Sequence, residues 1–243
     1  MKEKYEVHVI LLAGGTGTRF EAAIPKQFVE VDGIPIIIYT LKKLQVELVS
    51  GITIVCVESW IPYLRDLIEK FNIKKVDYIV KGGKSGFDST CRGFAAASKV
   101  VDDDDIIVIH DSVRPLLPTA VLADAVEKAV AHGNGCACLE SIEGLVLKDN
   151  DECGYESADR YRVMRVQTPQ AYKCSLLKEL LKKADEESKD DFPYADGLCI
   201  YYGVPIFFSK SFTANTKITT RPDIAFMKAM MQFSDEELMG DVI

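Results

Sequence analysis

The first half of the chain alternates between strand-length apolar runs and helical segments, and this alternation limits the choice of fold more than any other feature. The apolar runs cover residues 7–13, 51–57, 76–80 and 106–109. The helical segments that we predict between and after them cover residues 34–44, 62–71, 88–99 and 120–132. Strands that alternate with helices predict an α/β fold with a doubly wound, mainly parallel, Rossmann-like sheet that carries helices on both faces.

Polar or glycine-rich loops follow three of these predicted strands, at the point where each strand ends. The loops cover residues 14–19, 82–89 and 110–114. In open α/β sheets, ligands bind beside the carboxyl ends of the strands. The sequence therefore predicts one binding site where the three loops meet.

The second half of the chain follows a different pattern. Residues 136–146 and 161–166 are predicted strands that flank a polar excursion, which is typical of a protruding β-hairpin arm. The remaining predicted elements are a helix over residues 175–189, short strands over 199–202 and 206–209, and a final helix over 224–231. Because no linker or internal repeat interrupts the chain, we expect a single domain, residues 1–243, with an arm over about residues 137–166.

Composition excludes several classes of protein. The net charge is −8 and no basic face is visible, so we expect no nucleic-acid partner. No apolar stretch reaches the ~18 residues of a membrane span, and no signal peptide is recognisable, so we expect no membrane partner. The seven cysteines contain no CxxC pair, which favours reduced thiols in a cytoplasmic protein. Cys136 and Cys138 leave a metal pair open, although no partner ligands stand near them in the sequence.

The glycine loop over residues 14–19 departs from the two best-known phosphate-binding motifs. Phe20 stands where a dinucleotide-binding fold needs its third glycine, and Thr18-Arg19 does not match the lysine and hydroxyl of a P-loop. The loop instead has two cations close behind it, Arg19 and Lys26. Backbone N–H groups with two cations suit a triphosphate whose negative charge rises in the transition state. The alternative is a structural turn that carries two surface cations.

Five strings of residues, taken together, resemble the signature of the sugar-phosphate nucleotidyltransferases. They are residues 12–19 with 25–28, Gly82-Gly83 with Ser89, residues 110–115, Arg160 ahead of residues 167–170, and residues 215–219. More narrowly, they resemble the cytidylyltransferases that act on 2-C-methyl-D-erythritol 4-phosphate and on ribitol 5-phosphate. The resemblance covers nearly the whole chain. It implies the nucleotidyltransferase type of α/β fold and transfer of a cytidylyl group from CTP to a polyol phosphate.

The resemblance also implies a role for each matched residue. Arg19 and Lys26 would stabilise the transition state, Arg160 and Lys217 would position the acceptor phosphate, and Asp111 would hold Mg²⁺. The nucleotide-binding residues that it implies are Leu12, Ala13, Gly14, Gly15, Thr16, Gly17, Gly83, Lys84, Ser85, Gly86, Asp88 and Ser89. It further implies a homodimer that forms through the arm.

Three residues at or near the predicted site have simpler interpretations. Asp111 ends a predicted strand, so its carboxylate could merely cap a turn. Arg160 lies in the charged arm, where it could be solvated. His110 is expected to be a hydrogen-bonded structural residue, because phosphate oxygens need no base at neutral pH.

Four positions depart from the pattern of the family that the chain resembles. Gly86 stands where the family usually has an arginine, and Ala214 replaces an acid that could be a second metal ligand. Residues 143–144 and 193–196 replace motifs on the acceptor side. Because the four cations that the resemblance places at the site are kept, we predict an active enzyme with a shifted acceptor.

The acceptor itself is less closely specified than the nucleotide. The form of the glycine loop favours ribitol 5-phosphate, which belongs to cell wall biogenesis. The alternatives are 2-C-methyl-D-erythritol 4-phosphate of isoprenoid biosynthesis, another polyol phosphate, or a non-catalytic nucleotide-binding paralogue.

Overall fold

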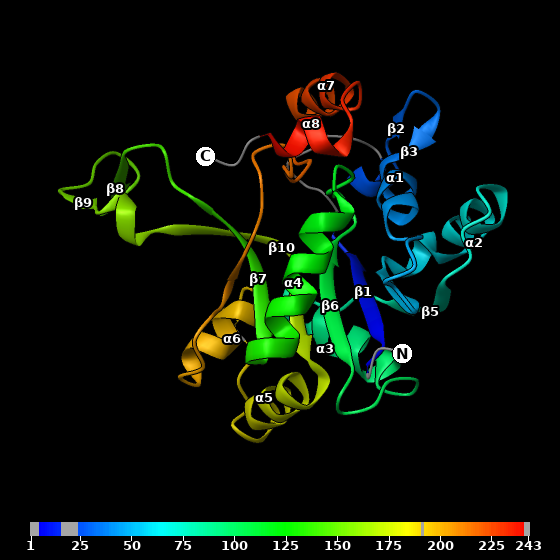
Figure 1. Cartoon of the computed structure of the whole chain (residues 1–243), viewed down its shortest axis with the longest axis horizontal. Helices are drawn as coiled ribbons and strands as arrows, with labels where there is room; N and C mark the ends of the chain where they lie inside the picture. Colours follow the sequence, from blue (N-terminus) through cyan, green and yellow to red (C-terminus); the bar gives the residue numbers. More distant parts are fainter. Residues whose placement is uncertain (1–4, 16–23, 191, 241–243) are drawn as a thin grey trace.

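The computed structural model describes residues 5–15, 24–190 and 192–240. Over these residues the main sheet has seven strands in the order β11-β7-β10-β6-β1-β4-β5 (Figure 1). The strands are β1 (Val7–Ala13), β4 (Gly51–Cys56), β5 (Val76–Lys81), β6 (Ile106–Asp111), β7 (Asn134–Glu140), β10 (Met164–Lys173) and β11 (Phe208–Ser209). Only β10 runs antiparallel to its neighbours in this sheet, β6 and β7. The predicted mainly parallel sheet is confirmed.

Helices cover both faces of the sheet, as a doubly wound fold requires. The first hydrophobic core contains side chains from α1 (Ile36–Lys43), α2 (Ile61–Lys70), α4 (Thr119–His132) and α7 (Arg221–Met230). The second contains side chains from α3 (Gly86–Ala97), α5 (Cys174–Glu186) and α6 (Ala195–Tyr201). Strand β1 supplies both cores, because Val9 and Leu11 point to the first and Ile10 points to the second. This central strand is therefore apolar on both faces apart from the buried His8, whose ring pairs with the Thr53 hydroxyl.

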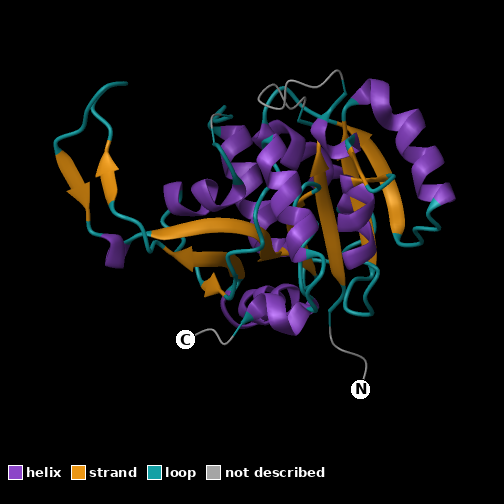
Figure 2. Ribbon diagram, turned by 90° about the horizontal axis from the view of Figure 1, so that it is seen from above, coloured by secondary structure: helices purple, strands orange, loops and turns teal. Residues whose placement is uncertain are grey.

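The arm leaves the body of the protein on the side of β7 and β10 (Figures 1 and 2). The far ends of these two strands pair with each other, with Met164 opposite Glu140. Beyond them lie the small hairpin of β8 (Leu145–Leu147) and β9 (Glu156–Ala158), and a 3₁₀ turn over Arg160–Arg162. The predicted arm is confirmed, but its first strand is divided into β7 and β8.

The prediction of a strand over residues 199–202 is wrong, because these residues end helix α6 or follow it. The buried side chains of this helix are Ala195, Leu198 and Cys199, whose spacing places them on one helical face. A four-residue apolar run fits a strand and a buried helix equally well, and here packing against the second core decides for the helix.

Other boundaries move by a few residues. Helix α3 begins at Gly86, two residues before the predicted start, because Ser85 caps it by accepting a hydrogen bond from the Asp88 N–H. Residues 34–35 are not helical, since β3 (Ile34–Pro35) pairs with β2 (Glu30–Val31). A short final helix, α8 (Asp235–Met239), was not predicted. Among the described residues, no helix combines the length and the apolar character needed to cross a membrane.

Gly135 allows β7 to pack closely on α4. A Cβ atom at Gly135 would lie 2.3 Å from the Ala125 carbonyl oxygen of that helix. We expect Gly135→Ala to lower the free energy of unfolding by about 1–3 kcal/mol, because a backbone atom of the helix must move. Gly144→Ala is the matched control, since a Cβ atom there meets nothing within 4 Å. Urea unfolding of both variants tests this, and equal stability of the two would contradict it.

Candidate active site

The register of the parallel strands brings the three predicted loops together. Leu12 pairs with Asp111, so the glycine loop begins beside the end of β6. On the other side of β1, Ala13 pairs with Cys56, which in turn pairs with Lys81 at the end of β5. All three loops therefore leave the same edge of the sheet.

Two of these loops touch through glycine backbones. A Cβ atom at Gly14 would lie 3.2 Å from the Ser89 hydroxyl and 3.4 Å from the Gly82 Cα atom. A Cβ atom at Gly82 would lie 3.2 Å from the Gly14 Cα atom. Larger side chains at these two positions would push the loops apart, so the glycines are required by close approach.

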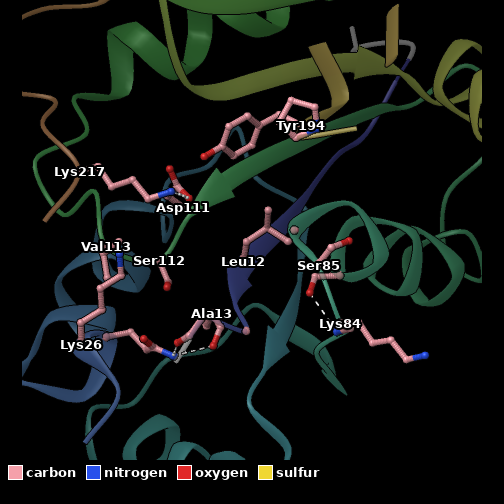
Figure 3. A pocket seen from close by; sticks show the side chains of 17 residues that line it. Leu12, Ala13, Lys26, Lys84, Ser85, Asp111, Ser112, Val113, Tyr194 and Lys217 are labelled. Atoms are coloured by element: carbon pink, nitrogen blue, oxygen red, sulfur yellow. Dashed lines mark hydrogen bonds and ion pairs between the residues drawn. The ribbon is translucent and has the colours of Figure 1, made fainter. Parts of the chain in front are cut away.

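A cavity of about 430 Å³ lies between the loops (Figure 3). This volume is in the usual range for a small-molecule site. The predicted nucleotide-binding residues that line it are Leu12, Ala13, Gly14, Gly15, Gly83, Lys84, Ser85, Gly86 and Ser89. Lys26, Asp111 and Lys217 also line it. The fold thus brings together most of the residues that the sequence assigned to one site.

The loop after β5 is held by its own hydrogen bonds. The Gly83 N–H donates to the Ser89 hydroxyl over 2.9 Å, and the Lys84 N–H donates to the Asp88 carboxylate over 2.8 Å. Arg92 donates to the same carboxylate over 3.0 and 3.2 Å. The hydrogen bonds from Arg92 and from the Lys84 N–H lower the pKa of Asp88.

This arrangement changes the role expected of Asp88. Its carboxylate is taken up by Arg92 and by the loop backbone, and Asp88 is not among the residues that line the cavity. These contacts give Asp88 a role in shaping the loop, and a direct role in nucleotide binding stays a prediction. Arg92 is engaged in the same ion pair and does not line the cavity. The Lys84 side chain points away from Asp111 and Lys26 in Figure 3.

Lys26 is the first residue of a 3₁₀ turn that packs against the glycine loop. The buried Gln27 amide donates to the Ala13 carbonyl over 2.6 Å and to the Gly15 carbonyl over 3.2 Å. The buried Phe28 ring stacks on Trp60 with 4.9 Å between ring centroids. These contacts fix the backbone at Lys26 relative to the loop, which limits where its ammonium group can reach.

Asp111 is the buried acid of the site. Its carboxylate accepts hydrogen bonds from the Lys217 ammonium over 2.8 Å and from the Arg114 guanidinium over 3.0 Å (Figure 3 shows the first). Burial alone would raise the pKa of Asp111, but Lys217 and Arg114 together lower it to about 2. The carboxylate is therefore ionised at neutral pH, and its contacts with Lys217 and Arg114 go beyond the alternative of a simple turn cap.

His110 lies beneath the site. The ring is fully buried, and its Nε2 atom pairs with the Arg114 carbonyl over 3.3 Å. Burial lowers the pKa of His110 to about 4, so the ring is neutral at pH 7. His110 does not line the cavity. Its surroundings agree with the structural role expected of it.

Some predicted residues are not brought to this cavity. Arg160 lies on the arm, where its guanidinium donates to the Ile142 carbonyl and stacks on the Tyr161 ring, and it does not line the cavity. Arg19, Thr16 and Gly17 lie outside the described residues. The roles of these four residues stay predictions.

The structure also adds residues that sequence reasoning did not assign. Gln27, Ser112 and Val113 line the cavity, and each lies inside a string that had already been singled out. Pro193 and Tyr194 line it as well, from the turn before α6. Their segment, residues 193–196, had been noted only as a departure from the family pattern, and neither side chain had been assigned a role.

The donor set at this site suits Mg²⁺ bridged by phosphates. Across the described ranges, no three His, Cys, Asp or Glu side chains are grouped as a protein-only metal centre. Asp111 is the acid that lines the cavity. Mg²⁺ keeps several waters and is commonly held by one or two carboxylates together with substrate phosphates, so a single carboxylate is sufficient. Cys136 and Cys138 are buried in the second core and form no such group.

An α/β sheet with a glycine loop, a second loop in backbone contact with it and an ionised acid at the same edge defines a nucleotide-handling enzyme. The solved structures agree on the fold. A 4-diphosphocytidyl-2C-methyl-D-erythritol synthase from Anaerococcus prevotii superposes with a TM-score of 0.78 at 23% identity, over 94% of this chain and 99% of that one. A 2-C-methyl-D-erythritol 4-phosphate cytidylyltransferase from Thermus thermophilus gives a TM-score of 0.76 at 21% identity, over 94% and 100%.

The chain belongs to the IspD family of cytidylyltransferases, described as 2-C-methyl-D-erythritol 4-phosphate cytidylyltransferase, which matches residues 7–233. A ribitol-5-phosphate cytidylyltransferase from Lacticaseibacillus paracasei is 34% identical over 93% of this chain and 98% of its own length. One from Vibrio parahaemolyticus is 33% identical over 91% and 94%. A 2-C-methyl-D-erythritol 4-phosphate cytidylyltransferase from Clostridium botulinum is 30% identical over 92% and 96%. The family resemblance inferred from the motifs is confirmed.

The ion pairs of Asp111 make a prediction about pH. Because the folded-state pKa of Asp111 is about 2, below the ordinary value of 3.8, the carboxylate stabilises the fold at neutral pH. This stability is lost as the pH falls through the range between these two values. At pH 7 we expect the native protein to have a higher free energy of unfolding than Asp111→Asn. This difference should shrink by about 2 kcal/mol as the pH falls to 2.

Urea unfolding at a series of pH values measures this difference. Asp66→Asn is the control, since Asp66 is an exposed acid on α2. If the difference in free energy of unfolding between the native protein and Asp111→Asn stayed constant from pH 7 to pH 2, the two ion pairs would not lower the pKa of Asp111.

Proposed function

We propose that this cytidylyltransferase transfers CMP from CTP to a polyol phosphate, with ribitol 5-phosphate as the favoured acceptor. An oxygen of the acceptor phosphate attacks the α-phosphorus of CTP. The bond between that phosphorus and the oxygen bridging to the β-phosphate breaks, and pyrophosphate leaves. Because the attacking oxygen is already anionic at neutral pH, no base is needed, which agrees with the buried, neutral His110.

One observation carries this proposal. The glycine loop, the loop over residues 83–89 and the Asp111–Lys217 pair line one cavity at the carboxyl edge of the sheet. Backbone N–H groups and lysines are the groups that bind and neutralise phosphates. The cavity therefore offers one side to a nucleotide and another to a second phosphate.

The described side chains fit separate tasks in this reaction. Lys26, fixed against the glycine loop by Gln27 and Phe28, would neutralise charge on the triphosphate, together with Arg19. Lys217 would hold the acceptor phosphate. Asp111 would hold Mg²⁺, which when bound shields the negative charge of the phosphates. Positioning and charge neutralisation are the main demands of this kind of transfer.

Two observations bear on the choice of acceptor: the names of the relatives and the form of the chain's glycine loop. Relatives named for ribitol 5-phosphate are 31–34% identical, and those named for 2-C-methyl-D-erythritol 4-phosphate are 30–33% identical. Because these ranges overlap, the preference for ribitol 5-phosphate is carried by the form of the glycine loop. The product would then be an activated polyol for cell-surface polymer synthesis, whereas methylerythritol phosphate would place the enzyme in isoprenoid synthesis.

Pyrophosphate release with CTP, Mg²⁺ and a panel of polyol phosphates tests the activity. We expect ribitol 5-phosphate to give the highest kcat/KM. Lys26→Ala should lower turnover by at least about 100-fold and change CTP binding by less than about tenfold, because its charge is needed most in the transition state. CTP binding without turnover of any acceptor would favour a non-catalytic paralogue, and equal losses of binding and turnover in Lys26→Ala would contradict its role.

We also propose that the protein is a homodimer formed through the arm. The arm exposes large apolar side chains far from the body of its own chain: Ile142, Val146, Leu147, Tyr155 and Tyr161 are all more than half exposed. Arg160 lies beside them and does not line the cavity of its own chain. If Arg160 positions the acceptor phosphate, it does so at the site of a second copy.

Mixing two inactive variants distinguishes this arrangement from a self-contained site. Lys26→Ala and Arg160→Ala should each have little activity alone. After dissociation and reassociation together, a mixed dimer should contain one site with both Lys26 and the partner's Arg160, so activity should reappear. If Arg160 served its own chain, no mixture would contain an intact site and no activity would return.

A further inference from the structure

Tyr194 occupies a position that local folding does not explain. It is the residue before α6, in an extended conformation, and its side chain makes no capping hydrogen bond. Ser, Thr, Asp and Asn are the residues that stabilise a helix at this position. Tyr194 is also 48% exposed and belongs to neither hydrophobic core. Neither helix capping nor core packing accounts for a tyrosine here.

The side chain is directed into the active-site cavity. Tyr194 lines the cavity, and the Lys217 ammonium lies 5.7 Å from the centre of its ring. Figure 3 shows the ring beside the end of β6, with its hydroxyl group on the side of the Asp111–Lys217 pair. Within the described part of the chain, that hydroxyl makes no hydrogen bond, so it is available to a ligand.

The Tyr194 ring lies apart from the glycine loop that follows β1, although the carbonyl oxygen of the neighbouring Pro193 would lie 3.5 Å from a Cβ atom at Gly86 in the other loop. Figure 3 shows Ala13 and Lys26 on the side of the cavity opposite to Tyr194. Tyr194 instead shares its side with Lys217, which pairs with the buried Asp111. A ligand that contacts the Tyr194 hydroxyl would therefore also meet the Lys217 ammonium.

We propose that Tyr194 binds the acceptor and contributes to its selection, an inference that rests on the proposed function. The Lys217 ammonium takes the phosphate, and the Tyr194 hydroxyl donates to or accepts from a hydroxyl group of the polyol chain. A phenol suits this partner, because it can be both donor and acceptor. The ring also covers one side of the Lys217 ammonium, so a phosphate can approach the ammonium only from the remaining sides.

Two variants separate the hydroxyl from the ring. Tyr194→Phe keeps the ring and its contact with Lys217 but removes the hydroxyl. Tyr194→Ser removes the ring and places a capping residue before α6, so that the fold is retained. We expect Tyr194→Phe to raise the KM for ribitol 5-phosphate about tenfold, because a polyol hydroxyl loses its partner, with the KM for CTP unchanged.

For Tyr194→Ser we expect a larger loss of kcat/KM for the acceptor, again with CTP binding unchanged. Tyr201→Phe is the matched control, since Tyr201 is an exposed tyrosine of the same helix that does not line the cavity. Its kinetics should match those of the native enzyme.

The outcomes also separate this inference from the proposed function. Native enzyme that turns over no polyol phosphate overturns the proposed function, and the inference with it. If the native enzyme is active and Tyr194→Phe has the same KM for the acceptor as the native enzyme, the inference alone is overturned. A rise in the KM for CTP that equals the rise for the acceptor would place Tyr194 at the nucleotide and overturn it as well.

Discussion

The ionised carboxylate of Asp111 is the interaction on which the arrangement of the active site depends. It joins the end of β6 to Arg114 three residues later and to Lys217, which is 106 residues away in the sequence. Arg114 extends the connection by donating to the Asn215 carbonyl over 2.6 Å. A buried charge is stable only when it is paired, so the chain around Lys217 must return to the end of β6 for this fold to form. The same pairing that stabilises this edge holds Lys217 at the cavity.

Much of the fold follows from the sequence because burial on both faces of a parallel sheet leaves a plain pattern. Apart from His8, the run over β1 is apolar, and the glycines that follow it mark the end of the strand. Once the sheet is parallel, its strand ends share an edge, which is why Asp111 and the two glycine loops could be placed in one site. The strand predicted over residues 199–202 failed for the converse reason, since a run that short has no period to distinguish a helix from a strand.

Side-chain roles were less predictable than positions. Asp88 stands in the right loop, but its carboxylate satisfies Arg92 and a backbone N–H instead of lining the cavity. Gln27 was not assigned a role, although its two hydrogen bonds hold the turn that carries Lys26. Tyr194 lies in a segment that departs from the family pattern, but nothing in the sequence indicated that its side chain would line the cavity. Such roles depend on which partner is nearest in space, and a one-dimensional pattern does not contain that information.

The contact between Gly14 and Gly82 has a consequence for how the site responds to a ligand. With only hydrogen atoms between the two backbones, neither loop can shift toward the other, and Ser89 closes the remaining space. The described start of the glycine loop and the start of the loop after β5 therefore form one continuous stretch of the cavity wall. If a nucleotide binds against this stretch as we propose, adjustment to different acceptors would have to come from the rest of the cavity lining, which includes Pro193 and Tyr194.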